Sequence, residues 1–247
     1  MKRIVIIGAT SALAEHCARL WLLKQPADLT LVGRDAQRVE RVAADLQVRS
    51  PQSRIRIIQA EFLDPDSIGL TARRISQAGP IDIVLIAHGS LPNQTECQDD
   101  LPACRDALSI NGLSPVLFAE AFAKELEQFK HGTLALIGSV AGDRGRKSNY
   151  VYGAAKGLLA RYAEGLQHRF AGTGVKIVLV KPGPMETPMT AHMKGAGVKL
   201  ASVEGVAKQV IKAIETGKPL LYTPEKWMLI MRIIQHLPRA IFNKLEI

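Results

Sequence analysis

The sequence predicts an α/β protein whose single domain is built on one doubly wound parallel sheet with helices on both faces. Three observations predict this class. Short runs rich in Ile, Val and Leu alternate regularly with longer amphipathic segments. The short runs are apolar on both faces, which is typical of strands that helices cover in a parallel sheet. The length of 247 residues suits one large α/β domain, and no repeat, low-complexity tract or Pro/Gly/Ser-rich linker divides the chain.

Seven apolar runs are predicted as strands, and six amphipathic segments as helices between them. Strands alternating with helices imply right-handed βαβ units. The strands are expected at Arg3–Gly8, Leu29–Gly33, Ile55–Ala60, Ile83–Ala87, Thr133–Gly138, Lys176–Val180 and Leu220–Tyr222. The helices are expected at Ala12–Lys24, Gln37–Val48, Ser67–Gln77, Cys104–Phe129, Val151–Phe170 and Val203–Glu215.

The composition is that of a globular protein, with 47% hydrophobic and 22% charged residues, and it excludes a disordered or collagen-like chain. The three cysteines (Cys17, Cys97 and Cys104) are odd in number and form no CxxC pair, so neither a disulfide framework nor a metal site is expected. The apolar run near the amino terminus is too short for a signal-peptide core, and no stretch is long enough for a membrane span. These features favour a cytoplasmic protein.

The net charge of +9 allows two interpretations. One is a solvated basic surface that aids solubility. The other is an acidic partner, such as a phosphorylated substrate, an anionic membrane surface or nucleic acid. No zinc finger, RNP-type motif or basic stripe interleaved with aromatic residues occurs, so nucleic acid is not expected as a partner.

The turn after the first strand is a candidate phosphate-binding site. Gly8 ends the strand, and Thr10 and Ser11 lead into the first helix, where backbone amides can approach a pyrophosphate and hydroxyl groups can add donors. Only Gly8 remains of the three glycines usual in dinucleotide folds, because Ala12 and Ala14 occupy the later positions. The alternative is a glycine that merely allows a tight turn.

The end of the second strand indicates which nucleotide binds. NAD-binding folds place Asp or Glu at this strand tip to accept from a ribose hydroxyl. This chain has Gly33 followed by Arg34, whose guanidinium can pair with a 2′-phosphate. Asp35 is interpreted as the N-cap of the next helix. The pattern favours NADP.

Ser139, Tyr152 and Lys156 form a candidate catalytic group. Ser139 ends an apolar strand, and the i, i+4 spacing puts the Tyr152 phenol and the Lys156 ammonium on one helix face. Free tyrosine has a pKa near 10, so acid–base catalysis at neutral pH needs a nearby cation to lower that pKa. Ser139 would bond the substrate oxygen and hold a carbonyl beside Tyr152. A lone Tyr-x3-Lys pair would instead be a tyrosine packed on a lysine stem.

Further motifs occur in a fixed order with these residues. Asn111 lies in Ser-Ile-Asn-Gly, Ser139 precedes Tyr152 by 13 residues, Tyr152-Gly-Ala-Ala-Lys156 follows, and Pro182-Gly-Pro-Met-Glu-Thr187 comes after the sixth strand. Together they resemble the short-chain dehydrogenase/reductase family over nearly the whole chain. The resemblance implies a Rossmann-type fold in residues 1–225, with NADP as cofactor. Residues 226–247 would then form an apolar, basic, helical extension.

The resemblance also implies roles for individual residues. Asn111, Ser139, Tyr152 and Lys156 would be catalytic, with Asn111 holding a water that links the lysine to solvent. The segment from Pro182 would cradle the nicotinamide through the backbone of Met185 and the hydroxyl of Thr187. The implied cofactor contacts are Gly8, Thr10, Ser11, Ala12, Leu13, Arg34, Glu61, Phe62, Ala87, His88, Gly89, Tyr152, Lys156, Pro182, Gly183, Met185 and Thr187.

Two positions depart from the family pattern. Ile86-Ala87-His88-Gly89 replaces the usual Asn-Asn-Ala-Gly, so Gly89 keeps its place near the cofactor ribose. Glu61 stands where a shorter Asp usually meets the adenine amine. His88 fits either a catalytic role or that of a hydrogen-bonded structural histidine.

The loop between Ser139 and Tyr152 carries Arg144, Arg146 and Lys147. Three cations at the mouth of the active site would suit a phosphate or pyrophosphate, although a solvated basic loop is the alternative. The GDR-x-R-x-SN-x-VYG pattern resembles reductases of the decaprenylphosphoryl keto-pentose in cell-wall arabinan synthesis and relatives in polysaccharide synthesis. This resemblance implies a keto-sugar on a polyprenyl phosphate.

The carboxyl-terminal tail from Trp227 to Ile247 is apolar, with scattered cations and a break at Pro238. Such a segment can lie in a membrane interface, with the apolar Trp227, Ile230, Ile233, Ile234 and Phe242 buried among the lipids and Arg232, Arg239 and Lys244 at the headgroups. A lid over the substrate pocket and a subunit-interface helix are alternatives.

The expected activity is NADPH-dependent reduction of a ketone to a secondary alcohol by a cytoplasmic enzyme that is peripheral to the membrane if the tail binds lipid. The alternatives are reduction of a small soluble ketone or a 3-oxoacyl thioester, and a non-catalytic nucleotide-sensing protein. A homodimer or homotetramer is expected to form through Cys104–Phe129 and Val151–Phe170, because the first helix carries more apolar surface than one sheet-facing stripe needs.

Overall fold

Seven parallel strands form one sheet, in the order β3-β2-β1-β4-β5-β6-β7, in a computed structural model that describes residues 1–191 and 200–245. The order reverses between β1 and β4, which is where ligands bind in open α/β sheets. The strands are β1 (Lys2–Ile7), β2 (Ala27–Gly33), β3 (Arg54–Gln59), β4 (Ile83–Ile86), β5 (Gly132–Ile137), β6 (Val175–Pro182) and β7 (Leu220–Thr223).

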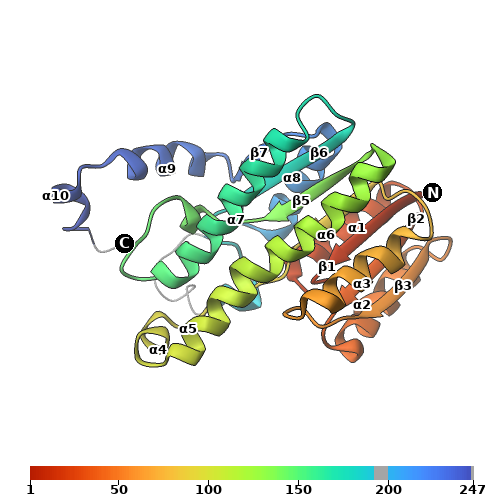
Figure 1. Ribbon diagram of the computed structural model, residues 1–247, viewed down its shortest axis with the longest axis horizontal. Coiled ribbons are helices and arrows are strands. Elements are labelled where there is room, and N and C mark those ends of the chain that lie inside the picture. Colours follow the sequence, from red (N-terminus) through yellow and green to blue (C-terminus); the bar gives the residue numbers. More distant parts are fainter. Residues whose placement is uncertain (192–199, 246–247) are drawn as a thin grey trace.

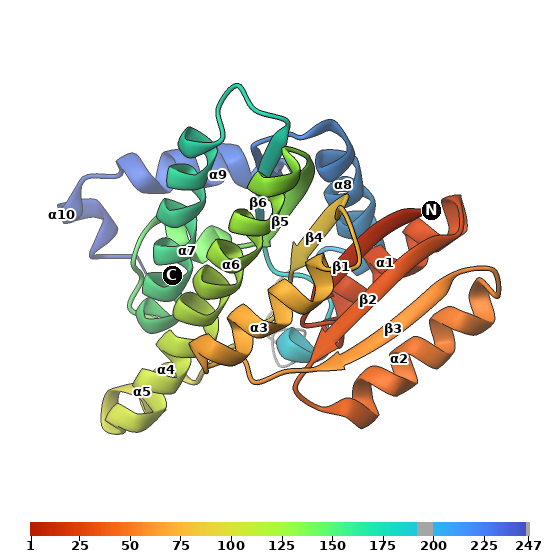
Figure 2. The ribbon, with the colours of Figure 1, turned by 45° about the vertical axis from the view of Figure 1, so that its right-hand side comes forward.

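Helices cover both faces of this sheet (Figures 1 and 2). Helices α1 (Ala12–Lys24), α2 (Ala36–Arg49) and α8 (Val203–Thr216) bury apolar side chains against one face. Helices α3 (Pro65–Ser76), α6 (Ser114–Phe129) and α7 (Tyr150–Arg169) do so against the other. The strands are therefore buried on both sides, which explains their continuous apolar runs.

The predicted α/β class with a single doubly wound parallel sheet is confirmed. All seven strands lie within two residues of the predicted ends, and α1 has the predicted ends, Ala12 and Lys24. The accuracy follows from a sheet in which each strand is one unbroken apolar run between turn residues.

The single helix predicted at Cys104–Phe129 is wrong. The segment contains α5 (Leu101–Leu108), a π-helical turn (Ser109–Leu113) and α6, and the unpredicted α4 (Gln94–Asp99) precedes them. Pro115 lacks the amide proton that a continuous α-helix would donate at this position, so the hydrogen-bond register changes in the turn before it. Both Asp100 and Asn93 accept amide hydrogen bonds as N-caps of short helices.

The tail forms two short helices, α9 (Lys226–His236) and α10 (Arg239–Phe242), which extend outward beyond the sheet (Figures 1 and 2). Residues 246 and 247 of the predicted extension lie outside the described residues. The Arg144 guanidinium donates to the carbonyls of Leu237 (2.8 Å) and Ile234 and lies 3.7 Å from the Phe242 ring centroid. No helix in the described ranges is long and apolar enough to cross a membrane.

Candidate active site

A cavity of about 740 Å³ lies along the carboxyl ends of the strands. Its walls come from the turn after β1, the ends of β2, β4, β5 and β6, the start of α7 and the start of α9. This is the edge at which open α/β sheets bind ligands. The volume lies within the range of small-molecule and cofactor sites.

The turn after β1 fits a phosphate group. Gly8 has φ +82°, and a β-carbon there would lie 2.6 Å from the β-carbon of His88, so a side chain would be both strained and obstructed. Ser11 is the N-cap of α1, yet its side chain makes no cap hydrogen bond. The first amides of α1 and the Ser11 hydroxyl are therefore available to an anion.

The end of β2 carries two cations beside this turn. Arg34 and Arg38 both line the cavity, and both are exposed. Asp35 is the N-cap of α2, as predicted, and accepts from the Arg38 amide at 3.1 Å. Within the described part of the chain, neither guanidinium is in an ion pair. The second cation was not predicted, although its i, i+4 spacing from Arg34 could have indicated it.

Ser139, Tyr152 and Lys156 converge in the wall of the cavity. The Lys156 ammonium is 5.8 Å from the Tyr152 ring centroid and donates to the carbonyl of Ile137 at 3.1 Å. Lys156 is 3% exposed, and burial lowers its pKa to about 8. At pH 7 this lysine is therefore still mostly protonated.

The pKa of Tyr152 moves in the direction opposite to the sequence-based expectation. Burial raises it, and the hydrogen bond with Ser139 lowers it only in part. In the protein alone, Tyr152 therefore holds its proton at neutral pH. The Ser139 hydroxyl oxygen also accepts from the Ala141 amide at 3.1 Å, which fixes the side chain at the start of a 3₁₀ turn, Val140–Asp143.

Asn111 lies behind the cavity wall, in the π-helical turn, and is fully buried. Its Oδ1 accepts from the Ser90 amide at 2.8 Å, and its Nδ2 donates to the Ala107 carbonyl at 2.9 Å. A β-carbon on Gly89 would lie 2.9 Å from Asn111 Oδ1 and 3.5 Å from Lys156 Nζ. The side chains of Asn111 and Lys156 therefore both lie against the backbone of Gly89.

The surroundings of His88 favour the structural interpretation over the catalytic one. It is 9% exposed, and burial, with the charges of Lys156 and Arg34, lowers its pKa to about 3. Its Nε2 lies 2.9 Å from the Ser114 hydroxyl, and its ring packs edge-on against Phe62 with 4.7 Å between centroids. A neutral histidine at this depth supports the turn at Gly8.

The segment after β6 borders the cavity opposite the turn at Gly8. Pro182, Gly183, Met185 and Thr187 line it, as the resemblance implies. The Thr190 hydroxyl bonds the Met185 carbonyl and lies 3.1 Å from the Thr187 hydroxyl. A β-carbon on Gly183 would lie 2.0 Å from the Trp227 indole nitrogen, so α9 begins directly against this segment.

The basic loop does not act as one patch. Arg144 binds the tail, whereas Arg146 lines the cavity. Between them and the sheet, the buried Asp143 carboxylate pairs with Lys181 at 2.6 Å and accepts from the Tyr222 hydroxyl at 2.8 Å. This cluster joins the catalytic loop to β6 and β7.

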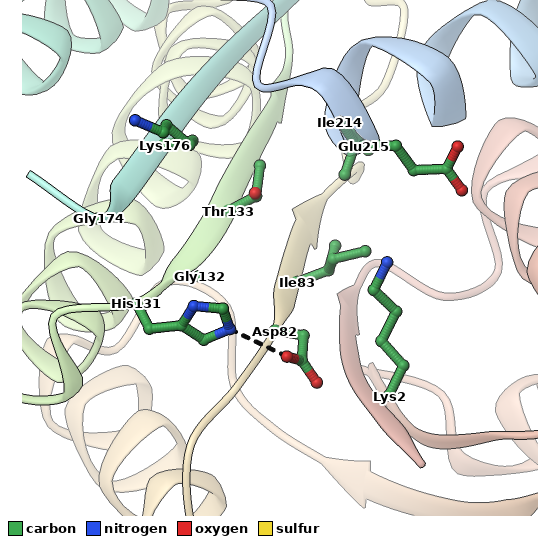
Figure 3. Close-up of a pocket in the computed structure, with 10 residues that line it drawn as sticks. All are labelled: Lys2, Asp82, Ile83, His131, Gly132, Thr133, Gly174, Lys176, Ile214 and Glu215. Atoms are coloured by element: carbon green, nitrogen blue, oxygen red, sulfur yellow. Dashed lines mark hydrogen bonds and ion pairs between the residues drawn. The ribbon is translucent and has the colours of Figure 1, made fainter.

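A second cavity, of about 200 Å³, lies at the amino ends of the strands. Figure 3 shows the His131 ring turned toward Asp82, and their side chains are 3.0 Å apart. Asp82 also accepts from the Arg3 amide at 2.7 Å. The Asp82 carboxylate is thus engaged within the protein, and the cavity contains none of the predicted catalytic residues.

Nearly all sequence-predicted site residues surround the larger cavity, although their roles remain predictions. Asn111 and Glu61 do not line it; Glu61 is exposed, and its amide donates to the Ser67 hydroxyl at 3.3 Å. Trp227 and Asn149 were not predicted as site residues, since no local signal tells such side chains from ordinary packing or capping residues. Predicted residues that line the cavity are Gly8, Thr10, Ser11, Ala12, Leu13, Arg34, Phe62, Ala87, His88, Gly89, Ser139, Tyr152, Lys156, Pro182, Gly183, Met185 and Thr187.

Comparisons with known proteins agree with this architecture. The chain is 27% identical to an uncharacterized oxidoreductase of Streptomyces coelicolor, over all of this chain and 96% of the relative. It is 28% identical to an uncharacterized oxidoreductase of Mycobacterium tuberculosis, over 98% of this chain and 96% of the relative.

A short chain dehydrogenase from Burkholderia cenocepacia, solved in complex with NADP, has the same fold. Its TM-score is 0.82 at 17% identity, with both chains covered completely. The family model for short chain dehydrogenases matches residues 2–196. The chain therefore belongs to the short-chain dehydrogenase family of oxidoreductases.

Proposed function

We propose that the protein is an NADPH-dependent reductase that converts a ketone into a secondary alcohol. The observation that carries this proposal is the convergence of Ser139, Tyr152 and Lys156 in the wall of one cavity. The turn at Gly8 and the cations Arg34 and Arg38 lie at the opposite half of the same cavity. The site thus has room for a dinucleotide beside a carbonyl compound.

The reaction divides between cofactor and protein. A bound NADPH would supply the hydride that adds to the carbonyl carbon. Tyr152 gives its phenolic proton to the carbonyl oxygen, so the C=O π bond breaks while a C–H and an O–H bond form. Ser139 donates a hydrogen bond to the same oxygen and orients it. Lys156 stabilises the resulting Tyr152 phenolate.

The phenolate must then regain a proton. Lys156, with its pKa of about 8, can give one up at neutral pH more readily than an exposed lysine. Asn111 and Lys156 both border Gly89, so the asparagine is placed to hold a water that returns a proton from solvent to the lysine. Asn111 is therefore a positioning residue in this scheme.

The choice of NADPH rests on charge. Arg34 and Arg38 present two guanidinium groups, neither in an ion pair within the described residues, where an NAD-binding fold carries a carboxylate. The Burkholderia and Sphingobium yanoikuyae structures that share this fold were solved with NADP and NADPH, respectively. Both observations favour the phosphorylated cofactor.

The test is NADPH consumption against a panel of ketones. The panel holds aromatic ketones, 3-oxoacyl thioesters and a keto-pentose, free and as its polyprenyl phosphate. Alcohol formation at the carbonyl carbon supports the proposal, and the preferred class separates a soluble from a lipid-linked substrate. Tight NADPH binding without turnover of any ketone would instead support the nucleotide-sensing alternative.

The finer hypothesis of a keto-sugar on a polyprenyl phosphate rests on the resemblance of the catalytic loop. Two observations modify it. Arg144 binds the tail, so it does not face a substrate phosphate. Trp227 lines the cavity and Phe242 lies under Arg144, so neither is available to lipid in the way that the sequence predicts.

A membrane contact of the tail would use other side chains. Met228, Leu229 and Ile233 of α9 are 43–64% exposed and lie near Arg232 and Lys226 in the sequence. We propose peripheral binding of an otherwise cytoplasmic enzyme to anionic lipid through this face. Replacing Leu229 and Ile233 by Glu should release the protein from phosphatidylglycerol vesicles. If the wild type and the variant sediment equally with vesicles, this face does not bind lipid, and the tail serves as a wall of the cavity instead.

We also propose a homodimer or homotetramer formed through α6 and α7. Phe118, Phe122 and Leu126 are fully buried against the sheet, whereas Leu113 and Leu158 remain about half exposed. Exposed leucines on α7 and in the π-helical turn that precedes α6 favour association. Light scattering at micromolar concentration tests it, and a monomeric mass would count against it.

A further inference from the structure

The three cations of the catalytic loop have different surroundings. The Arg144 guanidinium donates hydrogen bonds to the carbonyls at the end of α9. Lys147 is exposed and does not line the cavity. Arg146 lines the cavity together with Ser148, Asn149 and the catalytic Tyr152. Only one of the three is therefore placed to meet a substrate.

In the part of the chain that the structure describes, the Arg146 guanidinium has no carboxylate paired with it. Its Nε is buried and has no hydrogen-bond partner among these residues, and burial lowers the pKa of the side chain. Asp143 is the carboxylate whose charge acts on it, but Lys181 at 2.6 Å and Tyr222 at 2.8 Å already occupy that carboxylate. Across residues 1–191 and 200–245, no other carboxylate pairs with Arg146. A desolvated, unpaired guanidinium is costly unless a ligand completes it.

Asn149 adds a second polar group, whose side-chain oxygen has an unused capacity to accept a hydrogen bond. It is the N-cap residue of α7, yet its side chain does not cap the helix, and its Oδ1 is buried with no partner among the described residues. The amide of Val151 is instead satisfied by the Gln94 side chain at 3.0 Å. An amide oxygen accepts but cannot donate, so it suits a hydroxyl group rather than an anion.

The positive end of α7 lies at the same place. Helix α7 is 20 residues long; Asn149 directly precedes it, and Arg146 lies in the turn before Asn149. The aligned peptide dipoles favour negative charge at this end. The dipole of α7 and the unpaired Arg146 guanidinium therefore both favour the binding of an anion at this place.

We propose that Arg146 binds an anionic group of the ketone substrate, a carboxylate or a phosphate, and that Asn149 accepts from a hydroxyl beside it. The ketone is thereby a hydroxylated anion rather than a neutral compound. This inference rests on the proposed carbonyl reduction, because it concerns the substrate of the same site. Arg34 and Arg38 remain for the cofactor, since they lie beyond β1 from the catalytic residues.

The test compares matched ketones. 4-Acetylbenzoate is compared with its methyl ester, and 4-acetylphenyl phosphate with 4-methoxyacetophenone, each by kcat/KM with saturating NADPH. We expect the anionic member to be preferred by the wild type. Replacing Arg146 by Met should lower the anionic-to-neutral ratio by about 10- to 100-fold, the effect of losing one charge-assisted hydrogen bond. The pair with the larger ratio identifies carboxylate or phosphate as the anion.

Two variants serve as references. Arg161→Met removes the same charge from the exposed face of α7, where the side chain is 85% exposed, and should change the ratio by less than about twofold. Arg146→Lys keeps the charge without the planar fork and should give an intermediate ratio. Should Arg146→Met fail to fold, as judged by its melting curve, Arg146→Lys decides by the same ratio.

Binding separates this inference from the proposed function. Titration of 4-acetylphenyl phosphate into the NADPH-loaded protein, followed by calorimetry, needs no turnover. Arg146-dependent binding without reduction of any ketone would sink the proposed reductase and keep the anion site. Equal anionic-to-neutral ratios and equal binding in wild type and Arg146→Met would overturn the anion site and leave carbonyl reduction standing.

Discussion

The two ends of the parallel sheet treat charge differently. At the amino end, His131 pairs with Asp82 at 3.0 Å, and Glu215 pairs with Lys24 at 2.7 Å. At the carboxyl end, Arg34, Arg38 and Arg146 line the larger cavity and form no ion pair within the described residues. For these residues, the two ends differ in whether a charged partner lies within the described part of the chain.

The carboxyl end also holds groups whose ionisation the fold opposes. Burial lowers the pKa of Lys156 to about 8 and, together with the Lys156 and Arg34 charges, that of His88 to about 3. Shifted pKa values that are concentrated at one edge of the sheet are typical of a functional site. The comparison teaches that unsatisfied charge, rather than charge itself, marks the site.

The largest expected effect is the loss of the proton donor. Replacing Tyr152 by Phe should lower kcat for ketone reduction by about 10²–10⁴-fold, the usual contribution of general acid catalysis. NADPH affinity, measured by fluorescence titration, should change little because the phenol acts on the substrate. Near-normal turnover would remove the catalytic assignment of the carboxyl end.

The next effect concerns the unpaired cations at the β2 end. Replacing Arg34 by Leu should weaken NADPH binding by about 10- to 150-fold, since a hydrogen bond to a charged group is worth about 1.5–3 kcal/mol. NADH, which lacks the 2′-phosphate, should bind about as before. Arg41→Leu, on α2 just after this turn but outside the cavity, is the matched control. Equal losses for both nucleotides would assign Arg34 a structural role.

A third prediction concerns stability. The folded pKa of Lys156, about 8, lies below the value of 10.5 for a free lysine, so the charged ammonium opposes folding. Its cost is fully present below pH 8 and disappears as the pH rises to 10.5. Lys156→Met should therefore be inactive, yet more stable at pH 7 by about 1–3 kcal/mol, after allowance for the lost bond to Ile137.

Urea unfolding at pH 7 and pH 10 measures this difference. The advantage of the Met variant should shrink at pH 10, where the wild-type lysine is neutral in the folded protein. A variant that is less stable at both pH values would show that the hydrogen bond outweighs desolvation.

The smallest effect is expected at the amino end. His131 is 59% exposed, and replacing it by Ala removes one surface pair with Asp82, at a cost of about 0.2–1 kcal/mol. Ketone reduction should be unaffected, because the pair lies at the opposite end of the strands from the catalytic group. An altered kcat/KM in this variant would contradict the conclusion that only the carboxyl edge of the sheet takes part in the reaction.

Much of the fold was predictable because its signal is local. Each strand is one apolar run, and the N-cap at Asp35 was evident from the sequence. The helix from Cys104 was wrong because helical periodicity persists through the π-helical turn, and only the hydrogen-bond register reveals the break. That register depends on Pro115 and on tertiary contacts such as His88 with Ser114.

The candidate site was predictable where spacing carries chemistry. The Tyr152 and Lys156 pair follows from helical geometry, whereas Trp227 depends on how α9 returns to β6, which no local pattern encodes. The basic loop was predicted as one patch, because sequence places Arg144 and Arg146 together. The fold sends the first to the tail and the second to the cavity.

The link between the catalytic loop and the tail has a consequence for recombining this enzyme with its relatives. Arg144 and the Asp143 carbonyl contact α9 and the residues that follow it, and the Trp227 indole occupies space that Gly183 leaves open. A crossover placed between the loop and the tail would join partners that had not been selected together. The two segments should therefore be exchanged as one set when hybrid enzymes with new substrate ranges are built.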